Sequence, residues 1–362
     1  MVASLERSLV IRLSALLLFL FAALAAPAAA ATLDPLRTGA LPRSELGRPF
    51  QDRVITGDPR ARAAQVPRGP AADYTLPDGN VVEIETSPSY PDSAANLRST
   101  QTLVSFLASR VHGPEMSRLK VYVGKPAEIH QQCGSEQAVA CYYANQARMY
   151  VPGEQDPSGV PSEYAITHEY GHHIATFRKN ALGEAFLFGA EYWASYEHVC
   201  AGVRSGEFFP GDQDQNYLDN PGEGFADAYA HLPEHYPAAP FQFNRRFFPD
   251  AGADAALKRD ISDPWQGPRR DRFTGSLSAT RRSRSFAVPV NLDGNVVARL
   301  RAPRAARFQV QVALDGRVVD RAAKRISGTL CPPEGQGFGR VTVRVVRKAG
   351  AGSFTLSTSV AG

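Results

Sequence analysis

The chain has 362 residues, of which 43% are hydrophobic and 21% are charged, with four cysteines and eight histidines. Its 40 Lys and Arg against 36 Asp and Glu give a formal net charge of +4 at pH 7. This composition is typical of a globular protein, and its charge is too evenly balanced to predict a nucleic-acid-binding protein.

The first residues have the pattern of a secretory signal peptide. Arg7 and Arg12 precede an apolar core at 13–24, which is followed by Pro27 and a run of alanines. This core is too short to span a bilayer comfortably, and the small residues after it are typical of a cleavage site. We expect residues 1–31 to be removed and the mature protein to be secreted without a membrane segment. A retained anchor is the alternative.

The next part of the chain divides into an extension and a compact domain. Residues 32–72 are rich in Pro, Arg and Ala, and indicate a flexible extension or a short pro-segment. Residues 73–265 have the size of one domain. Its first predicted elements, in chain order, are a hairpin at 74–86, a helix at 93–111, a strand at 118–123 and a hairpin at 141–151. The strand at 148–151 is a candidate sheet edge for binding an extended peptide; an ordinary core hairpin is the alternative.

The most informative stretch lies in the helix predicted from residue 162 onward. Residues 168–172 read His-Glu-Tyr-Gly-His, the pattern H-E-x-x-H. Residues four apart lie on one side of a helix, one turn from each other, so His168 and His172 can reach a single metal ion. Glu169 then lies beside the ion, where it can take a proton from a water. A helix that contains two histidines by chance is the alternative.

A second helix is predicted at the sequence NPGEGFADAY, residues 220–229. Pro221 favours a helix start, and Glu223 and Asp227 lie one turn apart on the same face. Over residues 161–232 the two segments resemble gluzincin-type secreted zinc metallopeptidases, in which a Glu on the second helix is the third zinc ligand. In metzincins, the alternative branch, Gly and His would stand where this chain has Ala175 and Arg178.

The resemblance implies a role for each of these residues. His168, His172 and Glu223 would bind Zn²⁺, and Glu169 would be the general base. Asp227 would be a second-shell carboxylate that orients a ligand histidine through its other ring nitrogen.

Two points about this site have alternatives. Glu191 follows His172 at a spacing found in several gluzincins, but we favour Glu223 because an acid four residues on is absent after Glu191. The tetrahedral intermediate of peptide hydrolysis also needs a hydrogen-bond donor opposite the metal. Tyr229 and His231 are the catalytic candidates for this role, and Tyr217 is another; simple core packing is the alternative for each.

The four cysteines of an exported chain predict disulfide bonds. Cys133 and Cys141 are close in sequence and flank a loop, which favours a local disulfide. Cys200 and Cys331 would then pair with each other, although four cysteines permit three pairings.

The C-terminal residues differ from the rest of the chain in their sequence pattern. Residues 266–280 indicate a linker, and the Arg-rich patch at 268–284 is interpreted as a solvated linker rather than a binding site. Residues 281–362 contain short alternating strands separated by turns, which predict a β-sandwich. Asp293-Gly294, residues 343–345 and residues 352–356 resemble the bacterial pre-peptidase C-terminal domain.

Together these features predict an α+β protein, with a zincin-like metallopeptidase domain that has a small mixed sheet and an active-site helix, followed by an antiparallel β-sandwich. We expect a secreted, monomeric zinc metallopeptidase that acts on a peptide or protein substrate. The alternatives are a secreted zinc-binding protein that is catalytically inactive and serves adhesion or binding, and a zinc hydrolase that acts on another kind of substrate.

Overall fold

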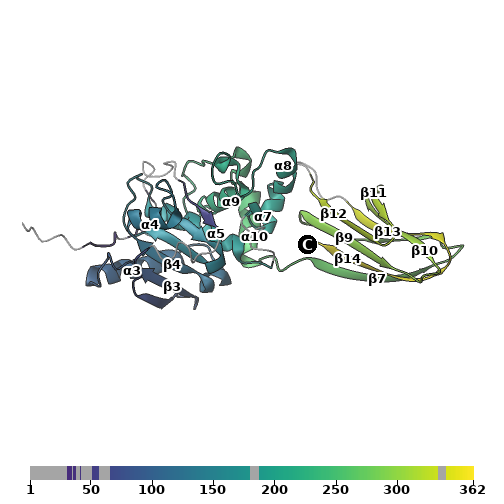
Figure 1. Cartoon of the computed structure of the whole chain (residues 1–362), viewed down its shortest axis with the longest axis horizontal. Helices are drawn as coiled ribbons and strands as arrows, with labels where there is room; N and C mark the ends of the chain where they lie inside the picture. The colour runs from purple at the N-terminus through teal and green to yellow at the C-terminus, as the bar shows by residue number, and fades with distance from the viewer. Residues whose placement is uncertain are drawn as a thin grey trace, which may run out of the picture.

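The computed structural model describes residues 31–34, 36–37, 41, 51–56, 66–179, 187–332 and 340–362. The chain forms two lobes arranged end to end, a mixed α/β lobe and an all-β lobe (Figure 1). The predicted signal peptide lies outside the described residues, except for its last residue, Ala31. None of the helices in the described ranges is long and apolar enough to cross a membrane.

The first lobe is built on a six-stranded sheet in the order β1-β5-β6-β4-β3-β2. Neighbours β1/β5, β3/β4 and β4/β6 are parallel, whereas β2/β3 and β5/β6 are antiparallel, so the sheet is mixed as predicted. The two predicted hairpins and the strand between them are confirmed. The strands are β1 (Val54–Ile55), β2 (Ala71–Thr75), β3 (Val81–Thr86), β4 (Lys120–Gly124), β5 (Cys141–Tyr143) and β6 (Arg148–Pro152).

One prediction about this sheet is wrong. The strand at 148–151 was a candidate sheet edge, but β6 lies inside the sheet between β5 and β4. At this end of the sheet the two-residue strand β1 is the edge, and it covers β5 by parallel pairing.

Helices pack against this sheet and against each other. Besides short 3-10 turns, the described helices are α3 (Ala94–Ala108), α4 (Pro126–Cys133), α5 (Ser162–Thr176), α7 (Glu191–Tyr196), α8 (Val199–Ser205), α9 (Pro221–Ala230) and α10 (Ala251–Ser262). The predicted helix at 93–111 is α3, whose N-cap Ser93 accepts a hydrogen bond from the Asn96 amide. α5 carries the H-E-x-x-H pattern, and its residues from Ser162 to Ala175 are all buried.

α5 and α9 lie in direct contact, and this contact depends on Gly171. A Cβ atom at this position would lie only 2.7 Å from the Cα of Ala226 on α9. Glycine therefore lets the two helix backbones approach closely. α9 begins at Pro221, as predicted, and the side chain of its N-cap Asn220 accepts a hydrogen bond from the Gly222 amide.

The second lobe consists of two four-stranded antiparallel sheets, which confirms the prediction of antiparallel strands in this part of the chain. One sheet has the order β12-β9-β14-β7 and the other β11-β10-β13-β8. Buried aliphatic and aromatic side chains, such as Val310, Val343 and Phe354, fill the space between the two sheets. The strands are β7 (Arg269–Leu277), β8 (Ser283–Ala287), β9 (Gly294–Arg301), β10 (Arg307–Leu314), β11 (Arg317–Ala322), β12 (Arg325–Leu330), β13 (Val341–Ala349) and β14 (Gly352–Val360).

The structure corrects the predictions for two segments, the linker and the N-terminal extension. The linker expected at 266–280 is largely strand β7, which pairs with β14 along nine residues. The extension at 32–72 is also not free of the first lobe, because Leu33 and Leu41 belong to its hydrophobic core and Asp52 is buried.

Both predicted disulfides are present. Cys133–Cys141 has a Cα–Cα distance of 5.7 Å, and Cys200–Cys331 has one of 5.4 Å. The second bond ties α8 of the first lobe to the residue after β12 of the second. Disulfide bonds fit a protein that functions outside the cell.

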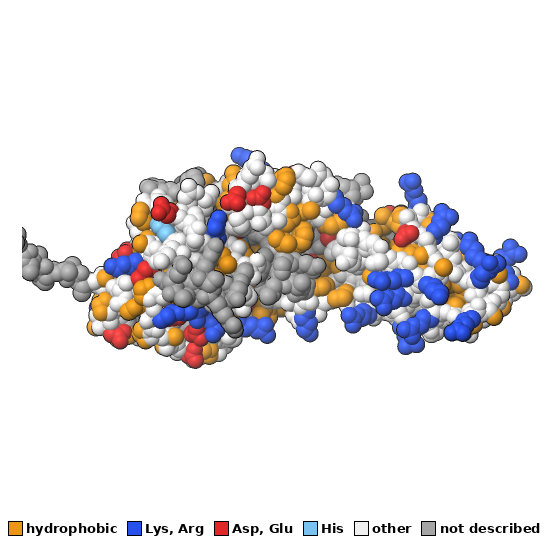
Figure 2. All heavy atoms as spheres, in the orientation of Figure 1, with side chains coloured by type: hydrophobic (Ala, Val, Ile, Leu, Met, Phe, Trp, Pro, Cys, Tyr) orange, Lys and Arg blue, Asp and Glu red, His pale blue; other side chains and the backbone are white. Residues whose placement is uncertain are grey.

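The surface charge differs between the two lobes. Figure 2 shows Lys and Arg side chains spread over the all-β lobe with few acidic ones among them, whereas the first lobe carries both signs.

Candidate metal centre

Four buried side chains converge at the contact of α5 with α9. They are Asp52, His168, His172 and Glu223, and one possible ligand atom from each lies within 4.8 Å of all the others. The His172 Nε2 atom lies 3.1 Å from Glu223 Oε2 and 2.9 Å from Asp52 Oδ2. The His168 Nε2 atom lies 3.4 Å from the same Glu223 oxygen. This group could hold a metal ion.

The elements around the cluster explain why these atoms face each other. His168 and His172 stand one turn apart on α5, and Glu223 stands in the first turn of α9, which Gly171 allows to lie against α5. The other oxygen of Glu223 accepts a 2.6 Å hydrogen bond from Gln213 Nε2. That bond leaves Oε2 directed at the histidines.

Asp52 was missed by the sequence analysis. It comes from the segment 51–55, which runs parallel to β5 and pairs with it at Val54 and Ile55. Its second carboxylate oxygen, Oδ1, accepts a hydrogen bond from the hydroxyl of Tyr217. The Asp52 side chain is completely buried.

Three further side chains surround His168. Asp227 Oδ1 lies 3.6 Å from His168 Nδ1, the ring nitrogen that does not face the cluster. The same carboxylate oxygen accepts a 2.6 Å hydrogen bond from the hydroxyl of Tyr164. The ring of Phe243 stacks on His168 at a centroid distance of 6.1 Å. These contacts hold the imidazole in one orientation.

Glu169 lies on α5 beside the cluster and is completely buried. Neither of its carboxylate oxygens has a hydrogen-bond partner within the described ranges. Burial raises the pKa of Glu169 well above its usual range, and the negative charge of Asp52 raises it further. A buried carboxylate without a partner is costly, so such a group is rare where it serves only the fold.

The electrostatics of the cluster suit a cation. Burial alone would lower the pKa of His172, but the carboxylates of Glu223 and Asp52 outweigh it and raise the pKa to about 10. The two carboxylates therefore draw positive charge onto the histidines, and a divalent ion would supply that charge in place of protons. Two imidazole nitrogens and two carboxylate oxygens are a ligand set that zinc and other first-row divalent metals accept.

The other residues considered from the sequence lie in different surroundings. The Tyr229 hydroxyl donates to the carbonyl of Val111 at 2.7 Å, and both ring nitrogens of His231 contact backbone carbonyls. The expected catalytic roles of Tyr229 and His231 therefore find no support in this geometry. Glu191 lies 3.5 Å from Arg178 and is not part of the cluster. Tyr217 does contact the cluster, through its hydrogen bond to Asp52.

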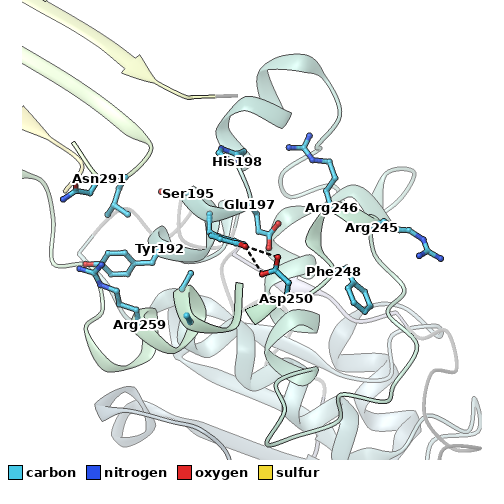
Figure 3. Close-up of a pocket in the computed structure, with 14 residues that line it drawn as sticks. Tyr192, Ser195, Glu197, His198, Arg245, Arg246, Phe248, Asp250, Arg259 and Asn291 are labelled. Atoms are coloured by element: carbon cyan, nitrogen blue, oxygen red, sulfur yellow. Dashed lines mark hydrogen bonds between the residues drawn. The ribbon is translucent and has the colours of Figure 1, made fainter. Parts of the chain in front are cut away.

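A separate hollow lies between α7, α10 and Asn291 of the second lobe. It is a cavity of about 850 Å³, in which Tyr196 donates hydrogen bonds of 2.9 and 3.0 Å to the two oxygens of Asp250 (Figure 3). Arg245, Arg246 and Phe248 also line it, and none of the four cluster residues does.

Comparison with known proteins gives little further information. No protein-family model matches the chain, and no curated protein matches its sequence. Among solved structures, the Yersinia pseudotuberculosis-derived mitogen matches at 12% identity over 26% of this chain and 86% of its own, with a TM-score of 0.22. The pre-peptidase C-terminal domain of a Bacillus anthracis collagenase matches at 13% identity over 25% and 88%, with a TM-score of 0.20.

A third structure is the Aeromonas hydrophila periplasmic inhibitor of g-type lysozyme, PliG. It matches at 13% identity over 26% of this chain and 87% of its own, with a TM-score of 0.19. Each of these likenesses covers about a quarter of the chain and is too weak to carry an inference about function.

Proposed function

We propose that the chain is a secreted zinc metallopeptidase whose ion is held by His168, His172 and Glu223. The observation that carries this proposal is Glu169, a buried carboxylate without a described partner next to a buried cluster of metal-ligand type. A purely structural metal site has no use for such a group. The covered edge of β5 also supports peptide as substrate, because an extended peptide can pair with such an edge.

The residues around the cluster would divide the chemistry between them. A zinc ion bound there would polarise the substrate carbonyl and lower the pKa of a water that it holds. Glu169 would take a proton from the attacking water as the water oxygen adds to the scissile carbonyl carbon. It would then pass the proton to the amine nitrogen as the C–N bond breaks. Asp227 keeps His168 oriented.

Tyr217 is our candidate for the donor that stabilises the tetrahedral intermediate. Its hydroxyl donates to Asp52 beside the ligand atoms, so it would face the substrate oxygen once Asp52 has left. Burial and the charge of Asp52 raise the pKa of Tyr217 well above its usual range, which keeps the hydroxyl protonated.

One observation favours a second function. With Asp52 the site would have four protein ligands, and a closed site of four ligands is typical of structural zinc. The chain would then be a secreted zinc-binding protein without catalytic activity.

The test uses the full chain and its Asp52→Ala variant, both loaded with Zn²⁺. Zinc content is measured by elemental analysis and hydrolysis by digestion of a denatured protein mixture, with and without a chelator. We expect chelator-sensitive hydrolysis in at least one of the two proteins, and its loss with zinc retained when Glu169→Gln is added. Hydrolysis by neither zinc-loaded protein would establish the binding protein instead.

The choice of third ligand has a matched control on the same chain. Glu223→Ala should lose zinc, whereas Glu191→Ala should keep it, because Glu191 lies outside the cluster. The reverse result would show that the assignment of Glu223 is wrong.

A further inference from the structure

Asp52 occupies the place that a water or substrate needs. Its Oδ2 atom lies 2.9 Å from His172 Nε2 and 3.6 Å from His168 Nε2, so it stands among the other possible ligand atoms of the cluster. A side-chain carboxylate, and not a peptide carbonyl, faces the cluster, so the segment is not itself positioned for cleavage.

The same segment also covers the edge of the sheet. The Val139 and Tyr142 amides each donate a 2.9 Å hydrogen bond, to the carbonyls of Gln51 and Arg53 respectively. Val54 and Ile55 continue this pairing along β5. These backbone groups are the ones that an extended peptide would use at this edge.

We propose that the segment Gln51–Ile55 is a built-in inhibitor that blocks both the metal and the peptide-binding edge until it leaves. This inference rests on the proposed metallopeptidase function. Displacement of the segment opens one coordination position and one strand edge together. The N-terminal stretch, which the sequence predicted to be a flexible extension or a short pro-segment, thus keeps the site closed through one residue, Asp52.

The test measures access to the metal separately from activity. The full chain is loaded with Co²⁺, and acetohydroxamate, a small ligand that needs an open coordination position, is followed by its change of the visible spectrum. Asp52→Ala should bind acetohydroxamate about tenfold or more tightly than the unaltered chain. Asp34→Ala is the matched control, because Asp34 belongs to the same N-terminal stretch but contacts the Gln155 amide.

The outcomes separate this proposal from the proposed function. Equal acetohydroxamate affinity of the unaltered chain and Asp52→Ala would overturn inhibition by Asp52. Suppose instead that Asp52→Ala binds acetohydroxamate more tightly but hydrolyses no protein. The segment would then still block the metal site, and the proposed peptidase function would be wrong. Should Asp52→Ala fail to fold, Asp52→Asn keeps the side-chain shape and an acceptor for Tyr217, and the same comparison applies.

A second, independent feature is the charge of the all-β lobe. Residues 266–362 contain 18 Lys and Arg against 5 Asp and Glu, whereas residues 32–265 contain 20 against 30. The nearly neutral total therefore hides two parts of opposite sign, of about +13 and −10. Such an asymmetry between parts of a chain indicates an interaction with a charged partner.

The positive charge is ordered on the outer face of the β12-β9-β14-β7 sheet. The strand register places Arg325 opposite Arg299, Arg299 opposite Ser357, and Ser357 opposite Arg272. Three arginines thus stand in one row across four strands. Arg270 and Arg301 lie two residues from this row on the same face, because side chains alternate along a strand.

Nothing on the described part of this face neutralises the row. All five arginines are exposed, and none forms an ion pair with a described acidic residue. The other outward side chains of β14 are Ser and Thr, at positions 353, 355, 357 and 359. Like charges directly opposite each other on neighbouring strands destabilise a sheet. A row of this kind is therefore better explained by a negatively charged partner than by stability.

We infer that this arginine face binds an acidic polysaccharide. Membrane insertion and base stacking need apolar or aromatic side chains, and the described outward positions of the four strands offer only Val297. Four strands span about 14 Å, which is wider than the major groove of DNA at about 12 Å. Arginines beside rows of hydroxyls suit carboxylate groups and sugar hydroxyls along one chain.

The test compares two variants with the same loss of charge. The face variant carries Arg272→Ser, Arg299→Ser and Arg325→Ser. The control variant carries Arg307→Ser, Arg317→Ser and Arg321→Ser, at exposed positions of the other sheet. Binding of the full chain to polygalacturonate is measured at 0.15 M salt, beside duplex DNA and vesicles that contain phosphatidylglycerol.

The face variant should bind polygalacturonate about tenfold more weakly, with the control close to the unaltered chain. An equal loss in both variants would show that net charge alone acts and would overturn the assigned face. Absence of binding, or tighter binding to DNA or to the vesicles, would overturn the assigned partner. Thermal unfolding of each variant checks that the lobe remains folded.

Discussion

Gly171→Ala tests the close contact of α5 with α9 on which the cluster depends. In an ordinary helix this change stabilises by about 1 kcal/mol, because alanine has the higher helix propensity. Here the new Cβ atom would lie 2.7 Å from the Cα of Ala226 and 3.1 Å from its carbonyl oxygen. Carbon atoms in contact stay about 3.5–4.0 Å apart, so the two helices must separate by roughly 1 Å.

The separation has two measurable results. Overpacking of this kind costs about 1–3 kcal/mol, which exceeds the gain in helix propensity, so the free energy of unfolding should fall. Metal–ligand distances tolerate only about 0.2 Å, and the ligands come from both helices, so zinc affinity should fall about tenfold or more. Urea unfolding in a chelator and competition with a chromogenic chelator measure the two effects. A variant that is more stable, with unchanged zinc affinity, would refute the close-contact reasoning.

Three further perturbations test other parts of the structure. Asp227→Asn should weaken zinc binding by about 10–100-fold in the same competition assay, and unchanged affinity would show that Asp227 does not support His168 as a ligand. His235 accepts a hydrogen bond from the Val111 amide, and burial lowers its pKa to about 4. Because this folded pKa lies below the unfolded value, the contribution of His235 to the free energy of unfolding should be complete above pH 6.5 and fall by about 3 kcal/mol towards pH 4. Burial also lowers the pKa of His173 to about 4, so His235→Gln should remove only its own share, roughly half of the slope that the two histidines cause in unfolding curves across this range. An unchanged slope would assign it to other groups. Replacing Cys200 and Cys331 together by Ser reopens a loop of 131 residues and should lower the free energy of unfolding by up to about 5 kcal/mol, whereas no change would argue against a stabilising crosslink.

The parts of the site that were predictable have local signals. The spacing of His168 and His172 and the helix start at Pro221 depend on residues within one or two turns, so the sequence reveals them directly. Whether Glu223 reaches the histidines depends on how closely two helices pack, and here only the resemblance, not the spacing, pointed to it.

The parts that were not predictable depend on long-range contacts. Asp52 lies 120 residues before His172 and just ahead of strand β1, whose two residues are too few to show any periodicity. The directions of Tyr229 and His231 depend on the rotation of α9 and the turn after it. Strand β7 begins with the charged residues Arg-Arg-Asp-Arg, and such a stretch resembles a solvated linker until its partner β14 is known.

The cluster joins three distant parts of the chain, with 120 residues between Asp52 and His172 and 51 between His172 and Glu223. An ion held by all of them acts as a reversible crosslink that closes two loops. At a free metal concentration of 100 times the dissociation constant, such an ion adds about 2.7 kcal/mol to the stability of the fold. The supply of metal would thus set how long the N-terminal segment stays attached and how stable the folded protein is.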